Sequence, residues 1–242
     1  MNFKKLVENI LAPPVCVFCK KELYVTSNYC VCRNCADIIP YNDGKRCRIC
    51  STPLDISYGD LYCLHCKRTK RSFNQNISRY IYKDGVAEAI KQMKFGQQQL
   101  WIAKALGAFL AQTIKENYGD ILFDMVIPVP LSKRGLRERG FNQSEVIAEE
   151  VCRNTGLFMN KNILLKSVDT PKQSSLNFKN RKQNVKGVFK LRNSELAADK
   201  TVLIIDDIFT TGATFNECAK ILKKAGALTV FCAAVAATEL HR

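Results

Sequence analysis

The stretch VLIIDDIFTTGAT (residues 202–214) decides the fold of this 242-residue chain. Residues 202–205 are apolar without alternation, which is typical of a parallel-sheet strand that is buried on both faces. Thr214 and Glu217 form a T-x-x-E capping box, and this pair predicts that a helix starts there. The buried stripe of that helix and the glycine that ends it then follow at helical spacing: Cys218, Ile221, Leu222, Ala225 and Gly226.

The turn between this strand and this helix has the chemistry of a phosphate site. It lies at the amino end of a helix, where free backbone N–H groups and the helix dipole favour an anion. The threonine hydroxyls add donors, and the two preceding acids suit sugar hydroxyls or a metal-bound pyrophosphate. A phosphorylated sugar fits both halves of the site.

The same residues resemble the phosphoribosyl-pyrophosphate (PRPP) signature of type I phosphoribosyltransferases. The resemblance implies that Asp206 and Asp207 hold the ribose hydroxyls as the catalytic pair, with Mg²⁺ on the pyrophosphate. It also implies a 5′-phosphate loop made of Thr210, Thr211, Gly212, Ala213 and Thr214. The alternative is an ordinary strand–turn–helix of a doubly wound sheet. A dinucleotide fold is disfavoured because no G-x-G-x-x-G follows an apolar strand.

A repeat of cysteines marks the N-terminal region. Each of four cysteines recurs 31 positions further on, as two C-x2-C pairs joined by 12 residues: Cys16, Cys19, Cys32 and Cys35, then Cys47, Cys50, Cys63 and Cys66. Four thiolates in two such pairs can close a tetrahedral zinc site, so we expect about two structural Zn²⁺ ions. The spacing alone leaves open a cross-braced pairing, in which alternate pairs share a metal. Cys30 has no counterpart in the second repeat and is either a spare thiol or an alternative ligand.

The cellular compartment of the protein decides whether the cysteines bind metal or form disulfides. The alternative to metal is a disulfide framework, but no secretory signal precedes the cysteines, and paired C-x2-C motifs in a reducing compartment favour metal. The longest apolar stretch, residues 225–237, is too short to span a membrane. We expect a cytoplasmic protein without a membrane span, which partners can bring to the inner face of the membrane.

Composition divides the chain into a cysteine-rich module, residues 1–70, and a larger domain, residues 71–242. In the larger domain, residues 71–76 read as a polar link. Helices are expected over residues 86–95, 100–114 and 144–152, and strands over residues 80–82, 125–130, 185–191, 200–205 and 228–236. This alternation predicts an α/β fold in which helices flank a parallel sheet.

Positive charge concentrates in two segments. The chain has a formal net charge of +15, and residues 126–200 hold 15 Lys and Arg against 7 Asp and Glu. The segments are residues 132–140, read as a loop after the second strand, and residues 166–192. The alternative to an anion-binding surface is a solvated basic face. Candidate nucleic-acid contacts are Arg137, Arg139, Lys179, Arg181, Lys182 and Lys186.

Several further pieces make the chain similar to the ComF family of competence proteins, which combine a double zinc ribbon with a phosphoribosyltransferase domain. They are residues 94–96 (KFG), 126–131 (VIPVPL), 139–143 (RGFNQ), 169–174 (DTPKQS) and the stretch quoted above. The resemblance implies that Leu131, Ser132, Lys133 and Arg134 border the pyrophosphate. It also implies a role in natural transformation, with single-stranded DNA and DNA-uptake proteins (helicase or channel components) as partners.

Two functions therefore stand. The first is a DNA-uptake factor that handles single-stranded DNA through a PRPP-binding domain and a zinc head. The second is an active phosphoribosyltransferase for an unidentified base, in which zinc is purely structural. Thr210 stands where purine-salvage enzymes carry an acid near the base, so the sequence leaves the transferase activity open.

Overall fold

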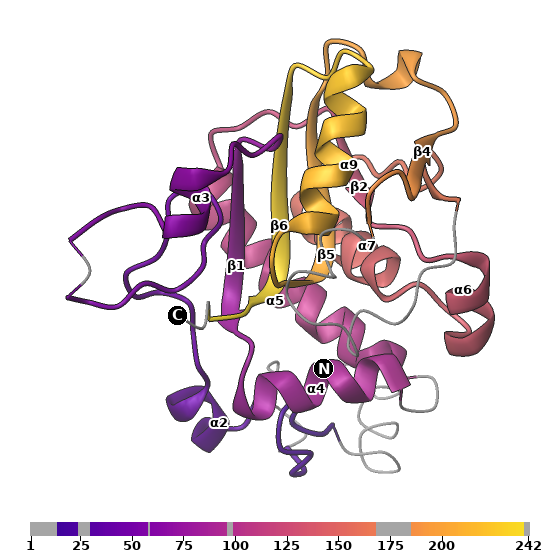
Figure 1. The fold of residues 1–242 in the computed structure, drawn as a ribbon. Coiled ribbons are helices and arrows are strands. Elements are labelled where there is room, and N and C mark those ends of the chain that lie inside the picture. Colours follow the sequence, from indigo (N-terminus) through magenta and orange to yellow (C-terminus); the bar gives the residue numbers. More distant parts are fainter. Residues whose placement is uncertain (1–13, 24–29, 58, 96–98, 168–184, 240–242) are drawn as a thin grey trace.

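A four-stranded, fully parallel sheet forms the centre of the computed structural model, which describes residues 14–23, 30–57, 59–95, 99–167 and 185–239 (Figure 1). Its strand order is β1-β6-β5-β2. The strands are β1 (Gln75–Ile81), β2 (Met125–Pro128), β5 (Thr201–Phe209) and β6 (Thr229–Ala237). The expected α/β fold is therefore confirmed, and the four parallel strands end at one edge.

Helices cover both faces of this sheet (Figure 1). The helices α4 (Asp84–Phe95), α5 (Leu100–Tyr118) and α7 (Gln143–Thr155) share one core, and α9 (Ala213–Lys224) packs into the other. Along β5, Leu203 and Ile205 enter the first core, whereas Val202 and Ile204 enter the second. All four are fully buried, because each face of the strand meets a helical layer.

Short elements complete the described chain. Two of them, α2 (Arg33–Ile38) and α3 (Leu64–Arg68), begin at a cysteine whose Sγ accepts a hydrogen bond from the helix: Cys32 in α2 and Cys63 in α3. The others are α6 (Lys133–Arg139), the strands β3 (Leu164–Lys166) and β4 (Phe189–Leu191), and the 3₁₀ helix η2 (Glu195–Ala197).

The structure corrects four expectations. Residues 132–140 form the helix α6 rather than a loop. The strand expected over residues 185–191 shortens to β4, which pairs with β3 in a separate antiparallel sheet. The polar link ends early, because β1 starts at Gln75 and Phe73 is buried. The capping box is wrong, because α9 starts at Ala213, after a left-handed Gly212.

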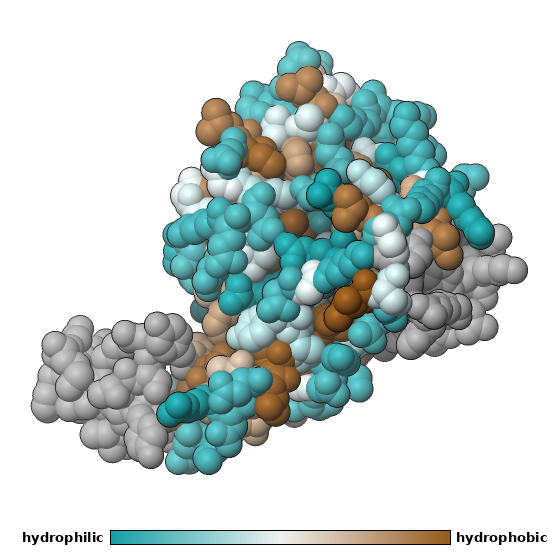
Figure 2. All heavy atoms as spheres, turned by 90° about the vertical axis from the view of Figure 1, so that its left-hand side faces the viewer, coloured by the Kyte–Doolittle hydropathy of each residue, from teal (hydrophilic) through white to brown (hydrophobic). Residues whose placement is uncertain are grey.

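The two cysteine sets pack into opposite cores. Cys16 and Cys35 belong to the core beneath α4 and α5, and the whole second set belongs to the core shared with α9. The cysteine-rich region is thus in contact with the sheet domain on both of its faces, and its separation at residue 70 stays a prediction. Hydrophilic residues cover most of the face that carries it (Figure 2). Within the described residues, no helix is long and apolar enough to cross a membrane.

Candidate functional site

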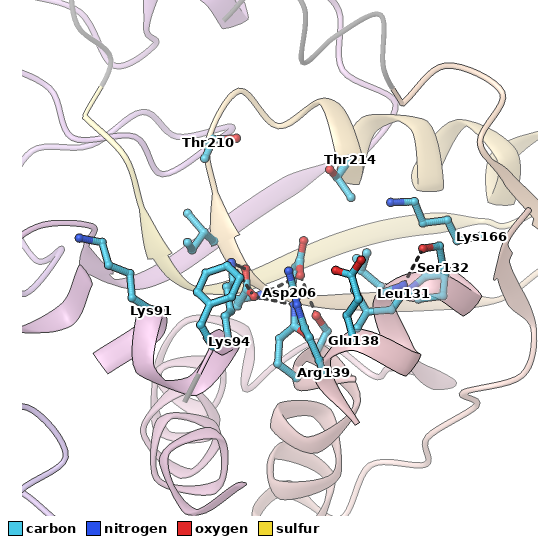
Figure 3. Close-up of a pocket in the computed structure, with 18 of the residues that line it drawn as sticks. Lys91, Lys94, Leu131, Ser132, Glu138, Arg139, Lys166, Asp206, Thr210 and Thr214 are labelled. Atoms are coloured by element: carbon cyan, nitrogen blue, oxygen red, sulfur yellow. Dashed lines mark hydrogen bonds and ion pairs between the residues drawn. The ribbon is translucent and has the colours of Figure 1, made fainter. Parts of the chain in front are cut away.

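A cavity of about 820 Å³ opens at the carboxyl edge of the sheet, where β2 and β5 end (Figure 3). The walls come from α4, from α6 with the loop before it, and from the start of α9. Several predicted residues line it together: Leu131, Ser132, Arg139, Asp206, Asp207, Thr210 and Thr214. The cavity thus brings residues of the basic segment and of the threonine-rich turn together at one site.

Other predicted residues lie outside the cavity lining. Thr211, Gly212 and Ala213 form the turn behind the wall, and Lys133, Arg134 and Arg137 are exposed on the outer side of α6. Lys186 is exposed as well. Lys179, Arg181 and Lys182 lie outside the described residues.

The two acids are held by three side chains from two other elements, α4 and α7. Asp207 is buried. Nζ of Lys94, in α4, lies 2.9 Å from both carboxylate oxygens of Asp207. Gln143 Nε2, at the start of α7, donates to Asp207 Oδ2 at 2.9 Å. Ser144 Oγ donates to Asp206 Oδ1 at 2.7 Å. Since each carboxylate is fixed by groups from α4 or α7, the pair is pre-organised at the cavity floor.

The electrostatic surroundings of the two acids differ. Burial raises the pKa of Asp206 to about 7, and the charge of Asp207 adds to the rise. Asp207 has a lysine as its direct counter-ion. The pair therefore offers one carboxyl group that exchanges a proton near neutral pH beside one that is paired with a cation.

The turn after β5 has a backbone that requires glycine. Gly212 has a φ of +73°, and a Cβ there would lie 2.4 Å from the Phe209 ring. Thr211 Oγ1 accepts from the Ala213 N–H. Glu217, the expected partner in the capping box, instead accepts from the backbone N–H of Gly187. The helix amino end thus faces the cavity without a side-chain cap from its N-cap residue, as an anion site requires.

Sequence reasoning missed several residues of the site. Lys91, Glu138 and Lys166 line the cavity together with Lys94, Gln143 and Ser144 (Figure 3). The motif pieces at residues 94–96 and 139–143 contained Lys94 and Gln143, but gave no sign that both side chains contact Asp207. Contact between Lys94 and Asp207 spans 113 positions, so no local pattern could reveal it.

Each cysteine set gathers into one cluster. The Sγ atoms of Cys16, Cys19, Cys32 and Cys35 lie within 4.8 Å of one another, as do those of Cys47, Cys50, Cys63 and Cys66. This pairing confirms one site per repeat and excludes the cross-braced alternative. Cys30 is not a member of either set.

The geometry of both clusters fits zinc. The Sγ atoms of Cys19 and Cys32 are 3.6 Å apart, and those of Cys50 and Cys63 are 3.7 Å apart. A tetrahedral site with Zn–S bonds of about 2.3 Å requires a sulfur separation of about 3.8 Å. All the cysteines are free thiols. Hydrogen bonding between Cys47 and Cys50 lowers the pKa of Cys47 and raises that of Cys50. Such thiols share protons, which a bound divalent metal ion can replace.

Comparisons with known proteins agree with this architecture. A family model described as phosphoribosyl transferase domain matches residues 145–240. Competence protein F of Haemophilus influenzae is 29% identical over 87% of this chain and 91% of that protein. The chain is similar to ComF competence proteins over most of its length. Competence protein ComFC of Bacillus subtilis is 29% identical over 81% of this chain and 79% of that protein.

The chain is also similar to the DNA utilization protein YhgH of Salmonella typhimurium, which is 28% identical over 91% of this chain and 96% of that protein. Among solved structures, the glutamine PRPP amidotransferase of B. subtilis aligns with 54% of this chain and 25% of that chain. Its identity is 23% and its TM-score 0.37, which is too low for an argument about function.

The motif at residues 139–143 has a clear structural role. Gly140 ends α6 with a φ of +78°. Asn142 caps α7 and also donates to the carbonyl oxygen of Val129 at 3.1 Å. Gln143 can then reach Asp207. The motif therefore joins the basic helix α6 to the acid pair.

Proposed function

We propose that this chain binds a PRPP-type ligand in the cavity and serves in the cytoplasmic handling of incoming single-stranded DNA during natural transformation. The ligand is a ribose 5-phosphate that carries a magnesium-bound pyrophosphate. The names of its relatives, competence proteins and DNA utilization proteins, support the proposed role in DNA handling. The cavity supports the proposed binding of a PRPP-type ligand.

The observation that carries the proposal is the acid pair at the cavity floor beside the glycine turn. Ribose hydroxyls both donate and accept hydrogen bonds, and a carboxyl group with a pKa of about 7, beside a second carboxyl group that is paired with a lysine, can match both demands. Gln143 Oε1 adds a buried acceptor that has no partner among the described residues. Two carboxylates alone would repel phosphate, but they favour the sugar between the charged ends of the ligand.

The cavity lining holds donors for the phosphate ends of the ligand. Thr214 at the amino end of α9, Ser132 and Lys166 all lie toward the same side of Asp206 (Figure 3). Leu131 and Ser132 line the cavity before α6, whose exposed Lys133 and Arg134 add positive charge nearby. A pyrophosphate there would bring its own Mg²⁺, which lowers the barrier to its departure.

Ligand-induced stabilisation tests this proposal. Millimolar PRPP with Mg²⁺ should raise the melting temperature, because a ligand that binds only the native state stabilises it by mass action. Gly212→Ala should remove the rise, since its Cβ would collide with Phe209. Gly140→Ala is the matched control: it has the same sign of φ, but no atom lies within 4 Å of its Cβ position. No rise in the parent protein would refute the proposal.

The DNA half rests on charge. The net charge is +15, and Lys133, Arg134, Arg137 and Lys186 are exposed outside the cavity lining. Such a surface attracts the backbone of single strands with little sequence preference. We propose that helicase or channel components of DNA uptake bring the strand to it, at the inner face of the membrane.

The alternative, an active phosphoribosyltransferase for an unidentified base, is favoured by one observation. Glu138 lines the cavity and supplies the carboxylate that Thr210 does not (Figure 3). A carboxylate there can accept the proton that an acceptor base loses. Release of pyrophosphate from PRPP in the presence of candidate bases, abolished by Glu138→Gln, would favour this alternative.

A further inference from the structure

The second cysteine cluster and the threonine-rich turn lie in one core. Cys66 belongs to the same buried group as Phe73, Phe209 and Phe215, which surround the turn. Phe73 meets Phe209 edge to face with ring centroids 6.2 Å apart, and Phe209 stacks on Phe215 at 5.9 Å. The aromatic column therefore runs from the cysteine-rich region to the first turn of α9.

Residues 71–73 connect the two sites directly. Nη1 of Arg71 lies 3.2 Å from the position that a Cβ on Gly212 would take, so its guanidinium packs against the turn. The backbone N–H of Ser72 donates to Asn216 Oδ1 in α9 at 2.8 Å. This segment, expected to be a mere link, holds the turn from behind.

The other side of Arg71 faces the cysteines. Its guanidinium lies beside the Cys66 sulfur and 5.7 Å from the Phe73 ring centroid. The Nε atom of Arg71 is buried without a partner in the described part of the chain. Burial of an unsatisfied donor is costly, so other contacts must hold this side chain in place.

We propose that Arg71 is a positioning residue that couples the second cysteine cluster to the phosphate-binding turn. It rests on Cys66 and fixes Gly212, and through it the N–H groups at residues 210–214, in the geometry that an anion requires. A bound metal would fix the position of the Cys66 sulfur, against which the guanidinium packs. The metal of the second cluster then supports ligand binding as well as folding, whereas the first cluster does not. This inference rests on the proposed phosphate site.

The test uses the zinc-loaded full chain and the variant Arg71→Met, which keeps a long side chain but removes the guanidinium group. The matched control is Arg46→Met: Arg46 is also half-buried in the second repeat, but it bonds to Asn42 O and Asn117 Oδ1, away from the turn. We expect hydrogen exchange of the amides at residues 210–214 to accelerate at least about fivefold in Arg71→Met only. Affinity for ribose 5-phosphate should fall by a similar factor, and affinity for magnesium pyrophosphate should not.

Coupling is reciprocal, so ribose 5-phosphate should slow zinc release to a chelator in the parent protein and not in Arg71→Met. Equal amide exchange at the turn in parent and Arg71→Met would overturn the proposal. If the parent binds no ribose 5-phosphate, the proposed function fails, yet amide exchange still decides the coupling. Arg71→Lys, which keeps the charge, replaces Arg71→Met if that variant does not fold, and parent-like exchange in it would likewise overturn the proposal.

Discussion

Asp206 and Asp207 adjoin in sequence but carry different charge environments. Asp207 is neutralised by Lys94, while burial and the neighbouring charge raise the pKa of Asp206 to about 7. Between the ordinary aspartate pKa of about 3.9 and this value, the folded protein binds a proton that the unfolded chain has lost. The stabilising contribution is therefore fully present below pH 4 and is lost as pH rises through 7.

Asp206→Asn should remove this pH dependence. Relative to the parent, its free energy of unfolding should rise between pH 5 and pH 8 by a few kcal/mol, because the asparagine never ionises. Denaturant titrations of both zinc-loaded proteins at several pH values measure the difference, from which the titration of the cysteines cancels. A difference that stays constant over this range would show that Asp206 is ionised throughout.

The elements show which features of the fold can be read from sequence. The apolar run before Asp206 predicted β5, and four of the cavity-lining residues after β2 and β5 were predicted as ligand contacts: Leu131, Ser132, Thr210 and Thr214. Helix α6 was missed because its seven residues bury none of their side chains, so no periodic stripe exists. Its ends are instead set by the Ser132 cap and by Gly140. The support of the acids by α4 and α7 depends on tertiary contacts that no local pattern encodes.

Helix α4 supplies Lys94, the counter-ion of Asp207. Removal of the lysine charge should lower the free energy of unfolding. Lys94→Met leaves the buried Asp207 without a cation, which costs on the order of 3–5 kcal/mol of stability. Adding Asp207→Asn should recover a large part of that loss. Lys91→Met, an exposed position one turn earlier on α4, is the control. Denaturant unfolding of the double-mutant cycle measures the coupling, and additive effects would mean that the ion pair is not formed in solution.

In the protein as a whole, the expected metal sites are part of the hydrophobic cores, because cysteines of both clusters are buried in them. Cys50 is 1% exposed in the core of α9, whereas Cys19 is exposed. We expect two zinc ions per chain by elemental analysis, and chelation should unfold the protein because both cores lose ordered cysteines. Cys50→Ser should lower the melting temperature more than Cys19→Ser. Metal-free protein with an unchanged melting temperature would refute this expectation.

The surface charge of the protein makes DNA binding testable through salt. Each phosphate neutralised on a single strand contributes a slope of roughly −0.7 in log affinity against log salt. The exposed Lys133, Arg134 and Arg137 lie outside the cavity lining, and their joint replacement by alanine should flatten the slope by about 2. Arg139 is left intact, because it lines the cavity and lies 5.5 Å from the Phe95 ring centroid.

A matched triple variant separates this surface from bulk charge. Alanines at the exposed Lys104, Lys115 and Lys220 on α5 and α9 also reduce the net charge from +15 by three, to +12. If a specific surface binds DNA, anisotropy of a labelled oligonucleotide across a salt series will show the flatter slope for the α6 variant alone. If both variants weaken binding equally, only overall charge attracts the strand. Parent-like slopes in both would remove α6 from the DNA surface, and the cysteine-rich region, where residues 1–70 hold 11 Lys and Arg against 6 Asp and Glu, would become the candidate.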